Sequence, residues 1–334
     1  MSKILIMHIL YTLNDKFVPQ VAAWICSICE NNKWEKINFH TISSWITEKN
    51  QNEMKKLAKK YDNELFVYEL KPLEEYFDFN FDTNWRNPIV LARLLVDKIL
   101  PDNIDRLLYL DGDTIVRWSL KELWQTDMWE KTIWMSIEPT EDKTRKDALW
   151  LHDYPYCNAG VLLINMKRFR EIKAWKTIID YYREHDWQLF ANDQDAINAS
   201  MKDEIYILPP KYNFYNIFWQ YPYRFMVKLM DNVPYFSKEK YRDSVKNPII
   251  IHYLWEERPW RAWNHHKYKG DYKKYLWITH RKDTPDEQWW RLYFVCWYVF
   301  NFIMKPFPSF RYKIINYLIP KFMTYRKRQL KKGK

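Results

Sequence analysis

The chain has 334 residues and a net charge of +11, of which +9 lies beyond residue 283, so a nearly neutral body precedes a basic tail. Only four glycines occur, which excludes the clustered-glycine loops of dinucleotide-binding and Walker-type proteins; any phosphate is expected to be held by side chains or a metal. The four cysteines lack a second Cys-x-x-Cys pair for zinc, and the first apolar run lacks a small-residue cleavage site, which predicts a reducing, cytoplasmic setting.

The first third of the chain alternates short apolar runs with helical patterns. This order is typical of βαβ units and predicts a mostly parallel sheet flanked by helices. Strands are predicted at 3–9, 37–42 and 65–70, and helices at 18–30 and 48–60. A further helix is predicted at 87–100, with Pro88 in its first turn, before an apolar strand at 106–110.

The remainder of the body continues the same alternation. Strands are predicted at 133–137, 160–165, 205–208 and 249–253, and helices at 167–185 and 193–201. The fold class is therefore α/β with a mixed, mostly parallel sheet. We expect a catalytic domain over residues 1–263 and a helical, basic and aromatic extension over 264–334.

The extension contains an apolar run at 292–304 in which Asn301 is the only strongly polar side chain. A helix of that length spans about 20 Å, too short to cross about 30 Å of bilayer hydrocarbon. Its aromatic and basic flanks favour a position on the cytoplasmic membrane leaflet. The alternative is an aromatic helix packed on the body beside a solvated basic end.

The strand at 106–110 leads directly into Asp111-Gly112-Asp113. Ligands of open α/β sheets lie at the carboxyl ends of the strands, and paired carboxylates there suit Mg²⁺ or Mn²⁺. A turn with two solvated acids is the alternative. His252, which follows an apolar run, becomes a third ligand if its strand lies beside the first; otherwise it is a satisfied core histidine.

Several motifs follow one another along the chain. They are Leu108-Tyr109-Leu110-Asp111-Gly112-Asp113, the Asn158–Asn165 segment Asn-Ala-Gly-Val-Leu-Leu-Ile-Asn, Asp193-Gln194-Asp195, Leu208-Pro209-Pro210-Lys211-Tyr212-Asn213, Ile251-His252-Tyr253 and Arg258-Pro259-Trp260. In order and spacing, this series resembles the family 8 retaining glycosyltransferases. The resemblance implies a GT-A fold, a UDP-sugar donor, Mn²⁺ with Mg²⁺ as a second option, and transfer with retention.

Carried over by position, the resemblance also implies roles for single residues. The implied metal ligands are Asp111, Asp113 and His252; the donor-binding residues are Asn14, Asp15, Arg93, Asp111, Gly112, Asn158, Ala159, Lys211 and Arg258; and the residues at the reaction centre are Asp193, Gln194 and Glu138. Two simpler interpretations stay open. Arg93 could pair with Asp97 along a helix, and Asp193 could be a helix N-cap.

The chain also departs from the family pattern. Trp255 lies where a glycine amide usually approaches the diphosphate; because tryptophan disfavours positive φ, either the loop differs or that contact is lost. Arg258 replaces a lysine, Asn14 an aspartate, and Glu138 a shorter aspartate. These differences affect donor identity and turnover more than metal binding.

The expected function is metal-dependent transfer of a hexose from UDP-glucose or UDP-galactose to a glycan or lipid-linked acceptor at the inner face of the membrane. Gln194 is a poor nucleophile, which favours attack on the leaving-group face over a covalent intermediate. One alternative is a UDP-sugar-binding protein with little turnover. Another is nucleic-acid binding by the basic tail, but the body is nearly neutral, so no nucleic-acid partner is expected.

Overall fold

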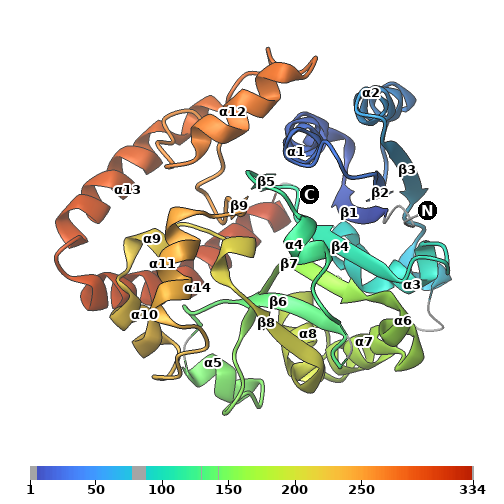
Figure 1. Ribbon diagram of the computed structural model, residues 1–334. Helices are drawn as coiled ribbons and strands as arrows, with labels where there is room; N and C mark the ends of the chain where they lie inside the picture. The colour runs from blue at the N-terminus through green and yellow to red at the C-terminus, as the bar shows by residue number, and fades with distance from the viewer. Residues whose placement is uncertain (1–5, 77–87, 129, 142, 333–334) are drawn as a thin grey trace.

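The computed structural model describes residues 6–76, 88–128, 130–141 and 143–332 (Figure 1). Its centre is a seven-stranded sheet in the order β3-β2-β1-β4-β7-β6-β8, and β5 and β9 form a separate pair. The strands are β1 (Met7–Leu13), β2 (Ile37–Ser43), β3 (Glu64–Glu69), β4 (Arg106–Leu110), β5 (Thr114–Val116), β6 (Ile133–Ile137), β7 (Cys157–Asn165), β8 (Ile205–Leu208) and β9 (Ile250–His252).

The main sheet is mixed and mainly parallel, as predicted. Strands β3, β2, β1 and β4 run parallel to one another, and so do β6 and β8. β7 is antiparallel to both of its neighbours, β4 and β6. The amino end of β7 therefore lies at the same edge of the sheet as the carboxyl ends of β4 and β6.

Helices cover both faces of this sheet. The α-helices are α1 (Val18–Asn31), α2 (Glu48–Lys59), α3 (Val96–Ile99), α4 (Lys121–Trp124), α5 (Lys143–Ala148), α6 (Met166–Glu171), α7 (Ala174–Glu184), α8 (Asp193–Ser200), α9 (Ile217–Gln220), α10 (Tyr223–Leu229), α11 (Lys238–Lys246), α12 (Lys269–Ile278), α13 (Arg291–Met304) and α14 (Pro308–Lys332). The 3₁₀ helices are η1 (Asp15–Phe17), η2 (Leu73–Glu75), η3 (Pro88–Leu95), η4 (Lys202–Glu204), η5 (Pro210–Tyr212) and η6 (Gln288–Trp290).

The alternation of β4 shows how the two faces are filled. Leu108 and Leu110 pack in the core that contains α1 and α2, whereas Leu107 and Tyr109 pack in the core that contains η3, α7 and α8. Successive side chains of a strand point to opposite faces of the sheet. A strand that is buried on both faces therefore has a continuous run of hydrophobic residues in its sequence. The next residue along, Asp111, is the first to leave the buried strand.

Most predicted elements agree with the structure, and the strands 106–110, 133–137 and 205–208 agree to the residue. β1 is later than predicted, and residues 3–5 lie outside the described part of the chain. The helix predicted at 167–185 is two helices, because Lys173 adopts a left-handed conformation with φ of 51° between α6 and α7. One helix is predicted at 87–100; residue 87 lies outside the described part of the chain, and residues 88–99 form the 3₁₀ helix η3 followed by one α-helical turn.

The C-terminal region is helical, as predicted, and it packs against the body. α12 lies on α1 and buries Tyr272, Tyr275 and Leu276. α13 and α14 cross one end of the molecule beside α9, α10 and α11 (Figure 1). In α14, Arg311 is buried and the Tyr312 hydroxyl donates to the Thr140 carbonyl at 3.0 Å.

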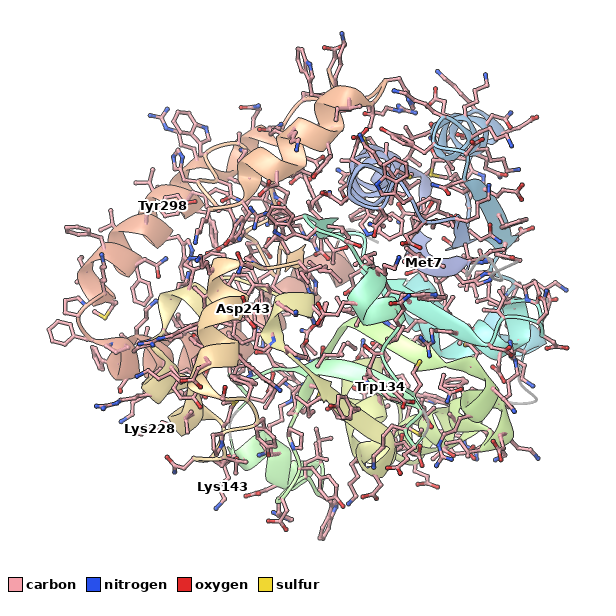
Figure 2. The ribbon with its side chains drawn as sticks, in the orientation of Figure 1. Met7, Trp134, Lys143, Lys228, Asp243 and Tyr298 are labelled. Atoms are coloured by element: carbon pink, nitrogen blue, oxygen red, sulfur yellow. The ribbon has the colours of Figure 1, made fainter. Side chains whose placement is uncertain are left out.

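The same helices expose apolar side chains. Figure 2 shows side chains on both the outer and the body-facing sides of α13, where Tyr298 is labelled. The exposed apolar residues of α13, α14 and their junction include Leu292, Val295, Val299, Phe302, Ile303, Phe307, Phe310, Leu318 and Phe322. Over the described residues, no helix combines the length and apolar character that spanning a bilayer requires.

Candidate active site

Asp111 and Asp113 lie in the turn between β4 and β5, at the carboxyl edge of the sheet. The Thr114 hydroxyl donates to the Asp111 carbonyl at 2.8 Å and closes this turn. β5 then pairs antiparallel with β9, with Thr114 opposite His252. Because this pairing starts directly after Asp113, it brings a histidine that is distant in sequence against the two carboxylates.

The three predicted metal ligands converge. His252 Nε2 lies 3.2 Å from Asp113 Oδ1 and 3.7 Å from Asp111 Oδ2, and one ligand atom from each residue lies within 4.8 Å of the others. The His252 side chain is 2 % exposed, whereas the Asp111 side chain is 27 % exposed. The site is therefore buried on the histidine side and accessible on the side of the first carboxylate.

A chain of hydrogen bonds fixes the proton on the imidazole. The backbone N–H of Gly160 donates to Asn158 Oδ1 at 2.9 Å, so that atom is an acceptor. Asn213 Nδ2 donates to the same oxygen at 2.9 Å, which leaves Asn213 Oδ1 to accept from His252 Nδ1 at 2.9 Å. Neutral His252 therefore carries its proton on Nδ1 and presents the lone pair of Nε2 to the carboxylates.

Gly160 has a steric reason to be glycine. A Cβ at this position would lie 2.1 Å from His252 Cε1 and 2.6 Å from His252 Nδ1. No side chain fits in that space, because contacts this short require the imidazole or the strand to move. One of the four glycines of the chain thus makes room for the histidine.

The charges of this cluster suit a cation. Burial lowers the pKa of His252, but Asp113 and Asp111 outweigh it and the net shift is upward. Burial raises the pKa of Asp113, but His252 and Arg258 outweigh it and the net shift is downward. Two carboxylates and one imidazole with an oriented lone pair fit Mn²⁺ or Mg²⁺, and Asn213 acts as the outer partner that fixes the histidine.

Arg93 links the carboxylates to a second acidic residue. Its guanidinium lies 3.2 Å from Asp111 Oδ1 and 2.6 Å from Asp193 Oδ2, and it donates to the Ala159 carbonyl at 2.6 Å. These ion pairs join different elements, so pairing with Asp97 along one helix does not describe Arg93. The N-cap position of α8 belongs to Asn192, and Asp193 is the first residue of the helix.

The residues predicted for the reaction centre surround the amino end of β7. Gln194 Oε1 accepts from the Ala159 N–H at 3.0 Å, and its Nε2 donates to the Tyr156 hydroxyl at 3.0 Å. Glu138 is buried. Its Oε1 accepts a hydrogen bond from the Thr140 hydroxyl at 2.5 Å, and its Oε2 lies 3.4 Å from Asn158 Nδ2. Burial raises the pKa of Glu138.

The other predicted donor-binding residues differ in position. Arg258 is close to the cluster, with its Nε 3.5 Å from Asp113 Oδ2. The Asn14 side chain accepts from the Lys16 N–H at 3.2 Å, and Asp15 Oδ1 accepts from Thr47 N and Asn50 Nδ2 at the start of α2. The Lys211 ammonium is directed to Glu122 of α4 at 3.1 Å rather than to the carboxylate cluster.

Two residues near the site add to what the sequence predicted. The role of Asn213 was not predicted, and the sequence left the conformation of the loop at Trp255 open. Asn213 ends one of the motifs, but only its contacts reveal that it orients His252. Trp255 has φ of 58°, so the loop does adopt the left-handed conformation that a glycine would favour. The indole is 47 % exposed, three residues after His252.

Comparison with known proteins agrees with this geometry. Residues 8–264 match the family model of glycosyl transferase family 8. General stress protein A of Bacillus subtilis is 23 % identical over 283 residues, which cover 84 % of this chain and 96 % of that protein. A lipopolysaccharide 1,2-glucosyltransferase of Escherichia coli is 26 % identical over 266 residues, 77 % of this chain and 74 % of that protein.

A solved structure has the same fold. The galactosyltransferase LgtC, in complex with donor and acceptor sugar analogs, superimposes with a TM-score of 0.69 at 22 % identity. The superposition covers 85 % of this chain and 99 % of that chain. The match of the family model over most of the chain, together with the converged carboxylates and histidine, identifies this protein as a member of glycosyl transferase family 8.

Proposed function

We propose that the chain transfers glucose or galactose from a UDP-sugar to a cell-surface glycan or lipid-linked acceptor, with retention at the anomeric carbon. The observation that carries the proposal is the convergence of Asp111, Asp113 and the Nε2 lone pair of His252 at the carboxyl edge of the sheet. A hard cation held by these carboxylates would also bind the diphosphate of a nucleotide-sugar.

The departing UDP is the group that needs stabilisation. When bound, Mn²⁺ or Mg²⁺ would stabilise the negative charge that develops on the diphosphate. Asp111, Asp113 and His252 would hold that cation, and Asn213 would keep the imidazole oriented. Arg258 lies beside Asp113 with a side chain 28 % exposed, so its guanidinium is available for a phosphate oxygen.

The donor sugar would lie between the cluster and the amino end of β7. Arg93 and Asp193 form a buried ion pair there, beside Asn158 and Ala159. These groups offer both hydrogen-bond donors and acceptors to sugar hydroxyls. The proposal keeps the roles that the family resemblance implies for the remaining residues. The UDP part of the donor would contact Asn14, Asp15 and Gly112, and the sugar or the acceptor would contact Glu138.

The contacts of Gln194 favour attack on the leaving-group face. Its carboxamide oxygen already accepts the Ala159 N–H, and an amide oxygen is weakly nucleophilic. We infer that the acceptor hydroxyl attacks beside the departing UDP and gives its proton to a phosphate oxygen. A trapped glycosyl adduct on Asp193, Gln194 or Glu138 would contradict this inference.

The relatives support the choice of donor sugar. They include lipopolysaccharide 1,2-glucosyltransferases of Escherichia coli and a 1,3-galactosyltransferase of Salmonella typhimurium, which is 24 % identical over 268 residues. UDP-glucose and UDP-galactose are therefore the first donors to test. A cell-surface glycan is the corresponding class of acceptor.

The C-terminal helices support a peripheral position on the inner membrane surface. Phe302 and Phe307 are 81 % and 58 % exposed, and the exposed lysines Lys305, Lys313 and Lys321 lie on the same helices or at their junction. Exposed aromatic side chains interleaved with basic residues suit the interface of an anionic leaflet. A lipid-linked acceptor would be concentrated at that surface.

The decisive experiment measures UDP release and thermal stability with each of the two UDP-sugars, with and without MnCl₂. We expect UDP release that depends on Mn²⁺, and stabilisation when Mn²⁺ and the preferred donor are both present. Asp113→Ala should abolish both effects. Asp102→Ala is the matched control, because the Asp102 side chain is 96 % exposed and lies outside the cluster.

Equal stabilisation of the wild type and Asp113→Ala would overturn the metal assignment. Donor-dependent stabilisation with only trace UDP release would favour the alternative of a UDP-sugar-binding protein with little turnover. The left-handed conformation of Trp255 is the observation that keeps this alternative in the experiment.

A further inference from the structure

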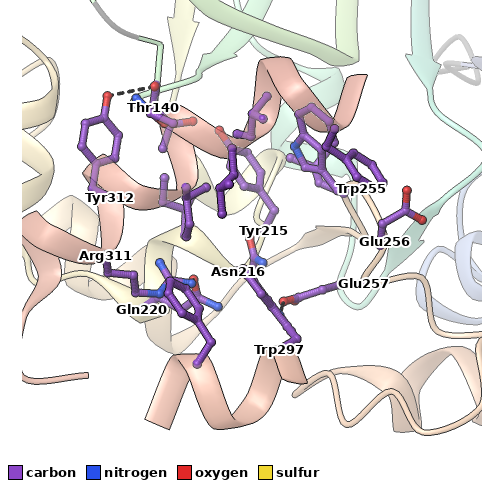
Figure 3. A pocket seen from close by; sticks show the side chains of 18 of the residues that line it. Thr140, Tyr215, Asn216, Gln220, Trp255, Glu256, Glu257, Trp297, Arg311 and Tyr312 are labelled. Carbon is purple, nitrogen blue, oxygen red and sulfur yellow. Dashed lines mark hydrogen bonds between the residues drawn. The ribbon is translucent and has the colours of Figure 1, made fainter. Parts of the chain in front are cut away.

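A cavity of about 440 Å³ lies between the body and the C-terminal helices. Its wall is formed by α9, the loop 254–257, α13 and α14 (Figure 3). The volume is within the range of about 300–1,000 Å³ that is typical of small-molecule pockets. Of the helices beyond the predicted catalytic domain, α13 and α14 therefore contribute to the wall of a cavity that is large enough for a small molecule.

Several polar side chains in the wall are hydrogen-bonded to protein partners. Arg311 donates to Asn301 Oδ1 at 2.8 Å, to the Tyr221 hydroxyl at 2.5 Å and to Gln220 Oε1 at 2.8 Å. Glu257 accepts from Trp297 Nε1 at 2.6 Å. The apolar parts of the wall come mainly from aromatic and branched side chains, among them Trp255, Tyr293, Phe300 and Ile315.

One end of the cavity meets the transferase site. Glu138 and Thr140 line this end, and Figure 3 shows the hydrogen bond from Tyr312 of α14 to Thr140. Glu138 also lies 3.4 Å from Asn158 Nδ2, and Asn158 belongs to the hydrogen-bonded chain that orients His252. A molecule in the cavity would thus reach the group assigned to the sugar or acceptor.

The same cavity also reaches the exposed apolar surface of α14. Leu318 and Phe322 line the cavity and are nevertheless 50 % and 37 % exposed. The cavity therefore connects the apolar outer surface of the C-terminal helices with the reaction centre. A flexible, apolar molecule is the kind of ligand that such a passage accommodates.

We propose that this cavity binds the hydrocarbon chain next to the sugar of a lipid-linked acceptor. The proposal rests on the proposed function and specifies its acceptor class: the glycan would lie at Glu138 and the hydrocarbon would extend toward Leu318 and Phe322. A peptide is a poorer occupant, because each buried backbone N–H and C=O needs a partner, whereas the wall groups described above already bond to one another.

The first experiment measures binding of dansyl-labelled undecanoic acid, whose fluorescence rises in apolar surroundings, to the full chain. We expect saturable binding of one probe per protein. Ile315→Trp and Ile319→Trp fill the cavity and should each weaken binding by about tenfold or more, since they exclude several methylene groups. Ile314→Trp is the matched control, on the same helix and also partly buried.

Equal weakening by Ile314→Trp and Ile315→Trp would overturn the proposal, because the effect would then reflect α14 as a whole. Binding of several probes per protein that survives both cavity variants would also overturn it, because the probe would lie on the outer surface. Thermal denaturation of each variant shows that it is folded under the conditions of the assay.

The second experiment compares transfer to decyl and methyl β-galactosides. The decyl compound should have a KM lower by about tenfold or more, and Ile315→Trp should remove this difference while kcat/KM for the methyl compound changes less than about twofold. Equal KM values in the wild type would overturn the proposal. No transfer to either galactoside, with probe binding lost only in the cavity variants, would count against the proposed acceptor while the hydrocarbon site stands.

Discussion

The transferase site and the C-terminal helices hold their side chains in different ways. At the site, His252, Asn213 and Asn158 each have one orientation, because every one bonds to the next and the chain ends on a backbone N–H. On α13 and α14, by contrast, Phe302 and Leu292 are 81 % and 75 % exposed. The proposed function of the first region depends on precise geometry, whereas the proposed membrane contact of the second depends on the composition of its exposed surface.

This difference determines which substitutions matter. A single methyl group placed beside His252 should disable the site, because the contacts there are specific and close. At the exposed, outward-facing side chains of the helices a single change should have a modest effect, because apolar area and charge add up over many residues. The following predictions go from the largest expected effect to the smallest.

Gly160→Ala should have the largest effect. The new Cβ would lie 2.1 Å from His252 Cε1, so the imidazole or the strand must move, and the contact of His252 with Asp113 is disturbed. We expect UDP release to fall by about a hundredfold, with a loss of stability of about 1–3 kcal/mol. Gly270→Ala is the matched control, since a Cβ there would meet no atom within 4 Å. Comparable activity of the two variants would contradict the steric role of Gly160.

Asn213→Ala should weaken Mn²⁺ binding without removing a ligand. The substitution leaves His252 Nδ1 without its acceptor, so the tautomer that presents Nε2 is no longer selected. A loss of metal affinity of about 10–100-fold is expected, measured by titrating Mn²⁺ against thermal stability. The exposed Asn247 provides the control Asn247→Ala. An unchanged affinity in Asn213→Ala would show that the imidazole is held by other contacts.

Replacing both Phe302 and Ile303 by aspartate should reduce flotation with vesicles that contain phosphatidylglycerol. These side chains are 81 % and 55 % exposed, and we expect a loss of about tenfold in the partition coefficient. Trp34→Asp is the control, because Trp34 is 96 % exposed but lies between α1 and β2. An equal loss in the control would count against the membrane assignment. So would a protein that retains nucleic acid at the same salt concentration but does not float with the vesicles, because that result favours the nucleic-acid alternative.

The last effect concerns pH; it is the smallest one near neutral pH and grows as the pH falls. Burial lowers the pKa of His266 from 6.5 to about 3. The unfolded chain therefore binds a proton that the folded chain excludes, so the free energy of unfolding falls as pH falls from 6.5 toward 3, by up to about 1.4 kcal/mol per pH unit. His266→Asn should reduce this slope, whereas His265→Asn, at an exposed neighbour, should not. Urea unfolding at several pH values tests this; equal slopes in the two variants would contradict it.

Two kinds of signal in the sequence indicated which residues come together in the candidate site. Asp111 and Asp113 follow a buried strand directly, and the motif order of the family indicated that His252 joins them. The supporting contacts could not be predicted in the same way. The need for glycine at Gly160 comes from a ring that lies 92 residues further along the chain, so only the folded contacts reveal it.

Two other residues show where local rules fail. Tryptophan disfavours positive φ, yet Trp255 adopts φ of 58° in the loop after β9 that forms part of the cavity wall. Lys173 likewise adopts a left-handed conformation and divides a segment whose pattern predicts one long helix. Tertiary packing overrides local preference at both positions, and a pattern of hydrophobic residues contains no information about that balance.

The direction of β7 has a consequence for how the protein tolerates change in length. Asn158 and Gly160 lie near the amino end of β7, which is antiparallel to both of its neighbours. Asn158 pairs with Ser136 of β6, and Val161 pairs with Leu110 at the end of β4. Successive side chains of a strand point to opposite faces of the sheet. Deleting one residue within 161–165 would therefore turn the side chains of the preceding β7 residues to the opposite face. His252 would then lose both the space beside Gly160 and the hydrogen bonds that orient its ring, so single-residue deletions at 161–165 are expected to be tolerated poorly.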